Sequence, residues 1–476
     1  METISRRTTQ PGWGRTTLEP RVILTTALAS AGGAELCLAD LVASGVTGAR
    51  LDVILGGPGR LADLVRERGL SPEWVAPPDR LTQLGDAVVA SRRGGRWIAL
   101  KRAASTLGAA WNHRRALRHA WRQRHPSAIV TLDLKTHLLA VGAIPPTSSL
   151  IWWMHDDPSI RPVATPLLRQ AVRLAARHPG GFGVVTCSGF VAEQVKRALN
   201  PPEHVPIVPI LNSIDLERLL GKGTVAARDH TQPECPEQPP PKAVQGTGGT
   251  RLRIGLVATY ARWKGHEVVL RALAALPERL VGRVEGVVVG GPIYRNPRSQ
   301  WSRDELERLA DHLGLGQPGR PPIQFRGHVD VPARVFDDLD MVVHASTRPE
   351  PFGRVIAEAL ALGLPVVTPG LGGAAEAAGL DRQPTPDEVA SGSGYRIHET
   401  CLTVPPNDPH SLAEALTRLV EDEPLRRRLA RSGPAFARNA FDLGRLPDQW
   451  AEAIARVSAT ARRRGSQPDP APASTF

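Results

Sequence analysis

Hydrophobic positions along the chain alternate between short β-branched runs and longer stretches with helical spacing. The run RVILTTALA at 21–29 has the pattern of a buried strand, and ELCLADLVASG at 35–45 has that of a helix. Further strand-like runs in this half lie at 51–56, 128–133, 150–155 and 183–188. Helical patterns such as 60–69 and 189–200 lie between them. Strands alternating with helices predict parallel β-α-β units in a doubly wound sheet.

Residues 221–250 interrupt this alternation. Their sequence includes TQPECPEQPPPKAVQGTGGT, whose prolines and glycines exclude a packed element and predict an exposed linker or inserted loop. Strand-like runs resume afterwards at 251–258, 284–291, 322–328, 339–346 and 365–370. The pattern therefore predicts two doubly wound domains, an N-terminal one at 21–220 and a C-terminal one at 251–440.

The two ends of the chain have other patterns. Residues 1–20 lack the apolar core of a signal peptide and predict a disordered lead-in. Residues 441–463 predict a helix that returns to the N-terminal domain, and 464–476 a disordered tail. No apolar run approaches the ~20 residues that span a bilayer, and the cysteines form no C-x-x-C pair. We therefore expect a cytoplasmic protein with reduced thiols.

Charge adds one feature, a basic segment at 92–125. The chain has a formal net charge of +12, and this segment carries ten Lys or Arg and no acidic residue. It also contains Trp97, Trp111 and Trp121. A helix that is basic on one side and apolar on the other suits an anionic membrane surface. The alternatives are that the segment binds nucleic acid, or that it is a solvated helix without a partner. Between nucleic acid and the membrane, we expect the membrane.

The stretch RPEPFGRVIAEALALGLPV at 348–366 carries the most chemistry. Pro349 and Pro351 keep Glu350 extended on a loop after a predicted strand, and a helix is predicted from about Gly353. Glu358 follows on that helix, so the amides at the helix start form an anion site between two carboxylates. These amides belong to Phe352, Gly353, Arg354 and Val355. The geometry suits a sugar nucleotide; the alternative is that Glu350 caps the helix and Glu358 is solvated.

Two loops at the predicted carboxyl ends of strands suit phosphate. Arg262 and Lys264 precede a helix after the strand at 251–258, which places two cations where a diphosphate could bind. Gly32 and Gly33, in SAGGAE, leave backbone amides unshielded beside a helix start. Surface cations and a tight turn without a ligand are the respective alternatives.

His155 ends an apolar strand and is followed by Asp156 and Asp157. A histidine there could orient a substrate hydroxyl, or it could cap the strand end through a backbone contact. The H-D-D group also suggests a metal, but no second cluster at ligand spacing supports one. We therefore predict no metal.

In their order along the chain, these motifs resemble glycosyltransferase family 4, retaining enzymes of GT-B architecture. EPFGRVIAEALALGLPVV at 350–367 follows that family's E-x7-E signature. The companion motifs are GGAE at 32–35, NSID at 212–215, WKG at 263–265, VVGGP at 288–292, FRG at 325–327 and GGAAE at 372–376. The resemblance covers roughly residues 21–460. It implies an α/β fold of GT-B type, with two doubly wound Rossmann-like domains facing across a cleft.

The resemblance also implies roles in holding the donor. Glu358 would hold the ribose hydroxyls. Glu350, with the amides of Phe352 and Gly353, would hold sugar hydroxyls near the reacting carbon. Backbone groups around Arg326 would contact the base.

Further roles concern the diphosphate and the transferred sugar. Lys264 would neutralise the leaving diphosphate, which Gly33 approaches from the other domain, and His155 would lie beside the sugar. The family commonly has an arginine where this chain has Thr259, and Arg262 would supply that charge. Such enzymes need no metal or other cofactor, because cations and helix amides take its place.

The expected function is therefore retaining transfer of a sugar from a nucleotide-diphosphate sugar to a hydroxyl acceptor, a cell-envelope glycan or lipid-linked molecule. The segment at 92–125 would place the enzyme against the inner face of the plasma membrane. Two alternatives stay open: a non-catalytic nucleotide- or polyanion-binding protein, and an epimerase or phosphorylase of similar architecture.

Overall fold

The computed structural model describes most of the chain. The described residues are 19–28, 32–82, 96–160, 164–220, 251–292, 299–329, 332–382 and 394–465, with the backbone alone at 80, 82, 96–106, 332–333 and 462–465. The predicted linker at 221–250 lies outside them, as do nearly all of the predicted disordered ends.

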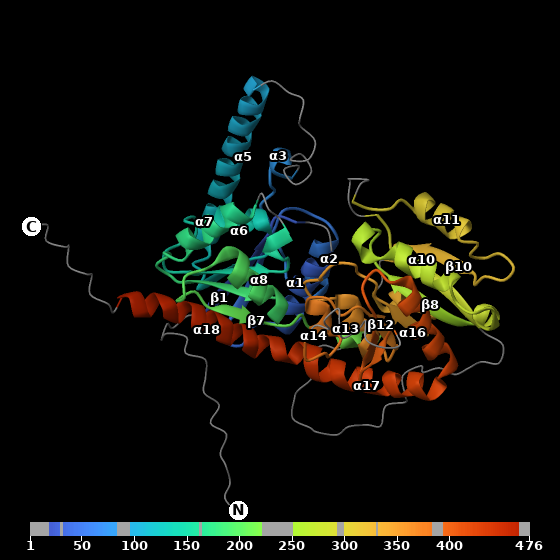
Figure 1. The fold of residues 1–476 in the computed structure, drawn as a ribbon. Coiled ribbons are helices and arrows are strands. Elements are labelled where there is room, and N and C mark those ends of the chain that lie inside the picture. Colours follow the sequence, from blue (N-terminus) through green and yellow to red (C-terminus); the bar gives the residue numbers. More distant parts are fainter. Residues whose placement is uncertain are drawn as a thin grey trace, which may run out of the picture. The chain divides into compact units, whose positions relative to one another are not determined.

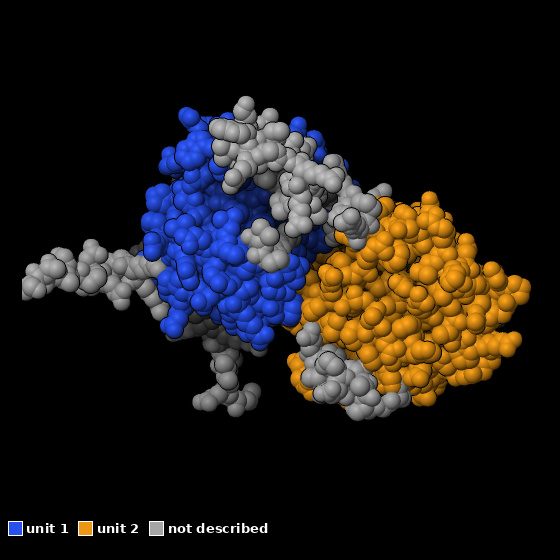
Figure 2. Space-filling model, turned by 45° about the horizontal axis from the view of Figure 1, so that its top comes forward, with its two compact units in different colours: residues 1–211, 443–476 blue, residues 212–442 orange. Residues whose placement is uncertain are grey.

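The chain forms two compact units (Figure 2). The first unit comprises residues 1–211 and 443–476, and the second comprises 212–442. The predicted N-terminal domain ended at 220, whereas the first unit ends at Leu211, so the short helix α9 (Leu216–Leu219) belongs to the second unit. The chain returns to the first unit at Leu443, ahead of the C-terminal helix α18 (Leu446–Gly465).

The first unit is built on a seven-stranded parallel sheet in the order β3-β2-β1-β4-β5-β6-β7. Figure 1 labels β1 and β7 of this sheet. Its strands are β1 (Arg21–Thr26), β2 (Arg50–Leu55), β3 (Glu73–Trp74), β4 (Ala128–Thr131), β5 (Ser149–Met154), β6 (Phe182–Thr186) and β7 (Ile207–Pro209). Its helices are α1 (Gly33–Ser44), α2 (Arg60–Glu67), α3 (Asp79–Thr82), α5 (Arg96–Gln123), α6 (Leu134–Ala140), α7 (Thr165–Ala175), α8 (Gly189–Leu199) and α18. The five strands predicted from the hydrophobic pattern are confirmed.

Helix α18 packs against the first unit's sheet. Trp450 on α18 is fully buried and meets Trp153 of β5 edge to face, with ring centroids 4.7 Å apart. Ile454 and Val457 continue the same buried stripe at helical spacing. In the described part of the chain, no helix is long and apolar enough to cross a membrane.

The second unit has a seven-stranded sheet in the order β10-β9-β8-β11-β12-β14-β13, parallel except for β13. Its strands are β8 (Leu252–Val257), β9 (Val284–Val289), β10 (Ile323–Gly327), β11 (Met341–Val343), β12 (Val366–Thr368), β13 (Arg396–Ile397) and β14 (Cys401–Thr403). Its helices besides α9 are α10 (His266–Ala274), α11 (Arg303–His312), α12 (Pro332–Val335), α13 (Arg354–Ala361), α14 (Gly373–Ala377), α16 (Pro409–Glu421) and α17 (Glu423–Phe441). All five predicted strands are present.

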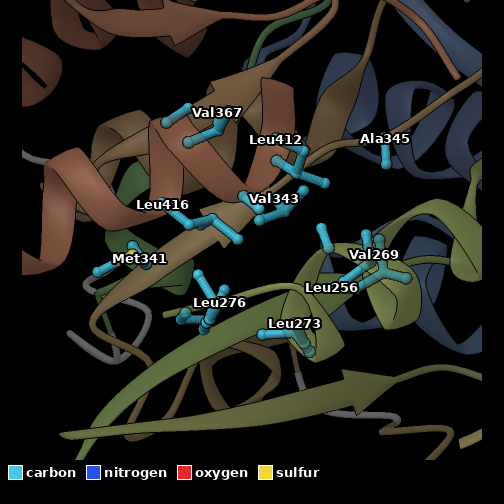
Figure 3. Packing of buried hydrophobic residues seen from close by; sticks show 14 of the residues in the cluster. Leu256, Val269, Leu273, Leu276, Met341, Val343, Ala345, Val367, Leu412 and Leu416 are labelled. Carbon is cyan, nitrogen blue, oxygen red and sulfur yellow. The ribbon is translucent and has the colours of Figure 1, made fainter. Parts of the chain in front are cut away.

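The core of the second unit lies between this sheet and the helices α10 and α16. Figure 3 shows Leu273 of α10 and Leu416 of α16 packed over the strand residues Leu256, Met341 and Val343. All five side chains are essentially inaccessible to solvent. Their burial holds the central strands rigidly, and the loops at the ends of those strands start from fixed points.

Both sheets reverse their strand order at the centre. In the second sheet the reversal lies between β8 and β11, which pair in parallel although β9 and β10 intervene in the sequence. In open α/β sheets, ligands bind beside the carboxyl ends of the strands at such a switch point. The loops that follow β8 and β11 are therefore the first place to look for a site.

Candidate active site in the second unit

Lys264 lies on the loop that follows β8. A 3₁₀ turn spans Arg262–Lys264, and Gly265 then adopts a left-handed conformation with φ of 77° before α10 begins. A Cβ atom on Gly265 would lie 2.0 Å from the Ala345 carbonyl oxygen, just beyond the end of β11. Only glycine permits this approach. The sequence at 265 thus brings the loop after β8 against the loop after β11.

Glu350 lies on the loop between β11 and α13, as the flanking prolines predict. Its backbone forms a parallel bridge with Gly372, in which the Glu350 amide donates to the Leu371 carbonyl and the Gly373 amide donates to the Glu350 carbonyl. The Glu350 side chain is only 6% exposed. Its backbone is therefore held on both sides, and its carboxylate is directed into the protein.

The carboxylate of Glu350 is held through one oxygen, Oε1. Lys264 Nζ lies 2.6 Å from this atom and His344 Nε2 lies 2.8 Å from it. The Ser346 hydroxyl donates to the same oxygen. These three donors come from the ends of β8 and β11, which the switch point brings together. The structure thus unites Lys264 and Glu350, which the sequence separates by more than eighty residues.

The charges at this position affect two pKa values. Burial alone would raise the pKa of Glu350, but the Lys264 ammonium and the hydrogen bonds from His344 outweigh it and hold that pKa well below its usual range. His266, one residue after Gly265, is fully buried, and burial and the nearby Lys264 lower its pKa to about 4. At neutral pH the site therefore holds an ionised Glu350, and His266 adds no charge.

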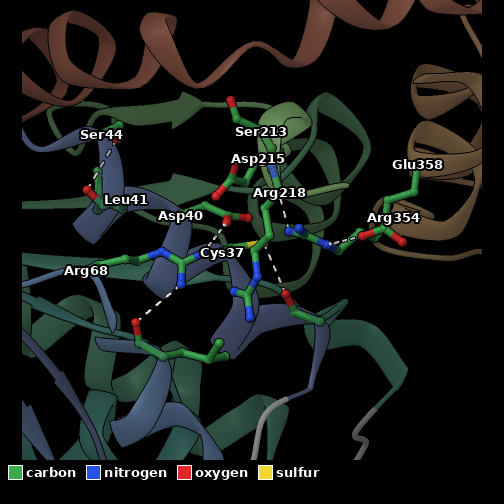
Figure 4. A network of polar contacts seen from close by, with 12 residues as sticks. Cys37, Asp40, Leu41, Ser44, Arg68, Ser213, Asp215, Arg218, Arg354 and Glu358 are labelled. Atoms are coloured by element: carbon green, nitrogen blue, oxygen red, sulfur yellow. Dashed lines mark hydrogen bonds and ion pairs between the residues drawn. The ribbon is translucent and has the colours of Figure 1, made fainter. Parts of the chain in front are cut away.

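Glu358 lies on α13, which begins at Arg354 as predicted. Arg354 Nε lies 2.7 Å from Glu358 Oε1, and each side chain is 14% exposed. Arg354 also donates to the Ser213 carbonyl, within the NSID motif (Figure 4). The alternative that Glu358 is a solvated residue is therefore wrong: it is partly buried and oriented by its neighbour.

The residues that precede α13 shape the start of the helix. Gly353 is the N-cap, with φ of 91°, and a Cβ there would crowd Ala374. Phe352 is 3% exposed and meets Phe441 edge to face. Val355, in the first turn, is partly exposed. The predicted alternative that Glu350 caps this helix is also wrong, because Gly353 occupies the cap and Glu350 pairs with side chains instead.

The side chains of Arg262, predicted at the diphosphate, and Arg326, whose backbone is predicted to contact the base, have other partners. Arg262 lies over the Trp301 ring, 3.8 Å from its centroid, and pairs with Glu305 at 3.1 Å. Arg326 donates to the Gln324 side chain and to the Asp337 carbonyl. Neither of these contacts joins the arginines to Glu350 or Lys264. A diphosphate role for Arg262 would require it to leave Trp301 and Glu305.

The residues predicted in the first unit lie at the carboxyl edge of its own sheet. Gly33 begins α1, and the Gly32 amide donates to Glu35 Oε2 at 2.8 Å, so the backbone here is already capped by the chain. His155 follows β5 directly and packs against the Trp153 ring, with centroids 4.6 Å apart. Among the described residues, no group of three or more His, Cys, Asp or Glu side chains is placed to hold a metal ion.

Sequence reasoning missed His344 and Ser346. His344 interrupts the apolar run LDMVVHAS near its end, the same position that drew attention to His155. A histidine at the carboxyl end of a buried strand was therefore an available signal in both domains.

Solved structures of other proteins match most of this chain. Over 91% of this chain and 99% of the other, the structure matches HepE from Anabaena in complex with UDP, with a TM-score of 0.64 and 22% identity. It also matches WaaG, a glycosyltransferase involved in lipopolysaccharide biosynthesis, with a TM-score of 0.53, 18% identity, and coverage of 91% of this chain and 99% of that one. The fold is GT-B. At these identities the likeness concerns the fold alone.

The sequence comparison concerns the second unit of this GT-B chain. Residues 241–436 match the family model described as glycosyl transferases group 1. A D-inositol 3-phosphate glycosyltransferase from Corynebacterium glutamicum is 29% identical over 219 residues, which are 44% of this chain and 44% of that protein. Its counterpart from Corynebacterium jeikeium is 33% identical over 39% of each chain. The matches thus span less than half the length of these curated relatives.

Proposed function

We propose that this protein is a retaining glycosyltransferase of family 4. It transfers a sugar from a nucleotide-diphosphate sugar to a hydroxyl group of a cell-envelope glycan or lipid-linked acceptor. The observation that carries the proposal is the contact of Lys264 Nζ with Glu350 Oε1, at 2.6 Å. It lies at the switch point of a sheet whose sequence matches the group 1 family model.

The chemistry follows from this pair. Glu350 binds sugar hydroxyls and Glu358 binds the ribose, while Lys264 and the amides at the start of α13 bind the diphosphate. In a front-face reaction, the acceptor oxygen bonds to the anomeric carbon as the bond from that carbon to phosphate breaks. The leaving phosphate oxygen takes the proton of the acceptor hydroxyl. The charge that grows on the phosphate is opposed by Lys264, which stabilises the transition state more than the ground state.

Two comparisons support the choice of substrates. HepE has been crystallised with UDP and with UDP-glucose, which supports a nucleotide-sugar donor. The curated relatives are named for D-inositol 3-phosphate, which supports a hydroxyl-bearing acceptor. We propose that protein cations replace a metal cofactor, so transfer should continue in excess EDTA.

A thermal-shift screen of UDP, GDP and ADP with their glucose and mannose conjugates tests the donor class. We expect one nucleotide family to raise the melting temperature, because a ligand that binds only the folded state stabilises it. Product analysis of the same mixtures then separates transfer from the alternatives. Binding without any turnover would favour the non-catalytic alternative, and conversion of the sugar itself would favour an epimerase.

A second proposal concerns the basic segment at 92–125, of which Arg96–Gln123 form the long helix α5. On this helix Leu107 is 71% exposed and Trp111 is 63% exposed. The exposed Arg115 and Arg118 continue the same face at helical spacing. We propose that this face meets the anionic inner leaflet of the plasma membrane, on the cytoplasmic side.

One tryptophan of this segment, Trp121, does not lie on the exposed face of α5. Trp121 is fully buried and donates through Nε1 to the Thr25 hydroxyl, so it holds α5 to the sheet and is withheld from a membrane. The side chain of Trp97 lies outside the described residues.

Sedimentation with phosphatidylglycerol vesicles at low salt tests the membrane proposal. Trp111→Ala and the pair Arg115→Glu with Arg118→Glu should reduce binding, because they remove apolar area and reverse charge. Trp74→Ala is the matched control, since Trp74 is an exposed tryptophan of the same unit. Equal sedimentation of the Trp111 and Trp74 variants would contradict the proposal, as would a wild-type protein that stays in the supernatant.

A further inference from the structure

His344 connects two neighbouring strands of the second sheet to Glu350. β11 and β12 pair in parallel with Val343 opposite Val367, so His344 and Thr368 are the next residues in register. His344 Nδ1 lies 3.0 Å from the Thr368 hydroxyl oxygen, and His344 Nε2 lies 2.8 Å from Glu350 Oε1. The histidine is 7% exposed. One ring nitrogen thus faces a hydroxyl and the other faces the carboxylate.

The donors and acceptors around His344 determine which atom carries the proton in its contacts with Thr368 and Glu350. The Gly370 amide donates to the Thr368 hydroxyl oxygen at 3.1 Å. That hydroxyl is then free to donate its own proton to His344 Nδ1, which leaves the proton of the neutral ring on Nε2. Nε2–H can donate to Glu350, whose ionised carboxylate only accepts. In this arrangement every donor in the relay has an acceptor.

We propose that His344 is a positioning residue for Glu350, and that the relay from the Gly370 amide through Thr368 fixes the ring nitrogen that faces the carboxylate. The inference rests on the proposed function, because it concerns how Glu350 meets the donor sugar.

Glu350 needs this support because Lys264 would pair with two anions, the Glu350 carboxylate and the donor diphosphate. In the structure its ammonium is bound to Glu350, and a donor diphosphate would compete for the same charge. His344 and Ser346 hold Oε1 from the side of the sheet, so they can keep the carboxylate in place when Lys264 turns to the phosphate. Within the described part of the chain, the contacts of the Glu350 carboxylate all go to Oε1. We expect Oε2 to accept a hydrogen bond from a sugar hydroxyl.

Two pairs of variants test the relay. His344→Leu removes the donor to Glu350, whereas His344→Gln keeps an N–H group at nearly the same reach. Thr368→Val removes the hydroxyl that orients the ring, whereas Thr368→Ser keeps it. The matched control is His137→Leu in the first unit, because His137 is also a buried histidine, with Nδ1 2.6 Å from the Thr131 hydroxyl.

The decisive readout is the ratio of two affinities, for a nucleotide diphosphate and for the same nucleotide carrying its sugar. UDP with UDP-glucose, GDP with GDP-mannose and ADP with ADP-glucose are the probes, measured by calorimetry on the full chain. His344→Leu and Thr368→Val should weaken the sugar nucleotide by about 10- to 100-fold, the range for a hydrogen bond to a charged group. The affinity for the nucleotide alone should be unchanged, and the Gln and Ser variants should recover most of the loss.

The results distinguish a failure of this inference from a failure of the proposed function on which it rests. If no pair of probes binds wild-type protein, the proposed function fails and the inference fails with it. If wild-type protein binds both probes, and His344→Leu or Thr368→Val keeps the wild-type ratio, the inference alone is wrong. If His344→Leu does not fold, Thr368→Val and Thr368→Ser decide the question. If His137→Leu also changes the ratio of the two affinities, the change reflects a general loss of stability and the inference is wrong.

Discussion

Two carboxylates at the carboxyl edges of the two sheets have different partners. In the first unit, Asp133 accepts hydrogen bonds from the Ala27, Lys135 and Thr136 amides, and so caps α6 and joins it to β1. In the second unit, Glu350 is bound by a lysine, a histidine and a serine side chain. Asp133 thus binds three backbone amides besides the Thr26 and Thr136 hydroxyls, whereas the Glu350 carboxylate binds side chains.

This difference separates structural carboxylates from candidate site carboxylates. Backbone amides cannot leave without unwinding a helix, so a carboxylate that they bind is not available to a ligand. A lysine side chain can turn from one anion to another at little cost to the fold. Glu35 belongs with Asp133, since it accepts from the Gly32 amide, whereas Glu350 is the carboxylate that a substrate can reach through its side-chain partners.

The largest effect is expected at Lys264. Lys264→Ala should lower kcat by about 10²–10³-fold, the usual cost of removing one group that opposes developing charge. Steady-state kinetics with the donor found in the screen measure this. Arg262→Ala is the control, because Arg262 lies on the same turn but pairs with Glu305. An equal loss in both variants would mean that the Lys264–Glu350 contact has no special role.

Glu350→Gln and Asp133→Asn compare the two sheets directly. Glu350→Gln should lower kcat/KM by about 10- to 100-fold, because a charged hydrogen bond to the sugar is weakened. Asp133→Asn should instead lower the unfolding free energy by about 1–3 kcal/mol, because both carboxylate oxygens accept hydrogen bonds and asparagine keeps only one acceptor oxygen; donor affinity should be unchanged. Urea unfolding and calorimetry report the two quantities separately. Loss of donor affinity in Asp133→Asn would contradict the assignment of Asp133 as a structural carboxylate and Glu350 as the site carboxylate.

Glu358→Ala should weaken binding of the nucleotide by about 1.5–3 kcal/mol, the value of a hydrogen bond to a charged group. Arg354→Ala breaks the same ion pair but keeps the helix amide at that position, so its effect on affinity should be smaller. Calorimetric titration of both variants checks this. If the two losses were equal, Glu358 would act through its pairing with Arg354 and not through the ribose.

The smallest effect concerns the pH dependence of stability, to which Glu35 in the first unit and Glu350 in the second contribute with opposite sign. Burial raises the pKa of Glu35, against the hydrogen bonds of its own and the Gly32 amide, whereas the pKa of Glu350 is lowered. Glu350 therefore contributes stability above its unfolded pKa, and that contribution is lost as pH falls through the folded value. Glu35 opposes stability once pH rises through its raised pKa.

Urea unfolding at pH 7 and at pH 5 measures both contributions. Glu35→Gln should stabilise the protein at pH 7 and by less at pH 5, and Glu350→Gln should destabilise it at pH 7. A stabilising effect of Glu350→Gln at pH 7 would contradict the assigned pairing.

Most of the fold was predictable because buried parallel strands leave continuous apolar runs. RVILTTALA and RLRIGLVA each contain an inner strand of a sheet, beside its switch point. The short strands β3, β7, β13 and β14 were missed, since two or three residues give no period. Thr368 and His344 could not be paired from the sequence, because their contact depends on the register of β11 with β12. The partners of Arg262 depend likewise on where the loop at 299–301 returns.

Hydrogen–deuterium exchange of the full chain, with and without a saturating nucleotide diphosphate, tests the central claim most directly. The nucleotide is the one that gives the largest thermal shift. We predict slower exchange of the amides at 352–356, at the start of α13, and at 262–265, beside Lys264, because these groups meet the ribose and diphosphate. The start of α6 at 133–137 in the first unit, where Asp133 already binds the backbone, should exchange as before. Protection at 133–137 without protection at 262–265 and 352–356 would contradict the assignment of the donor site.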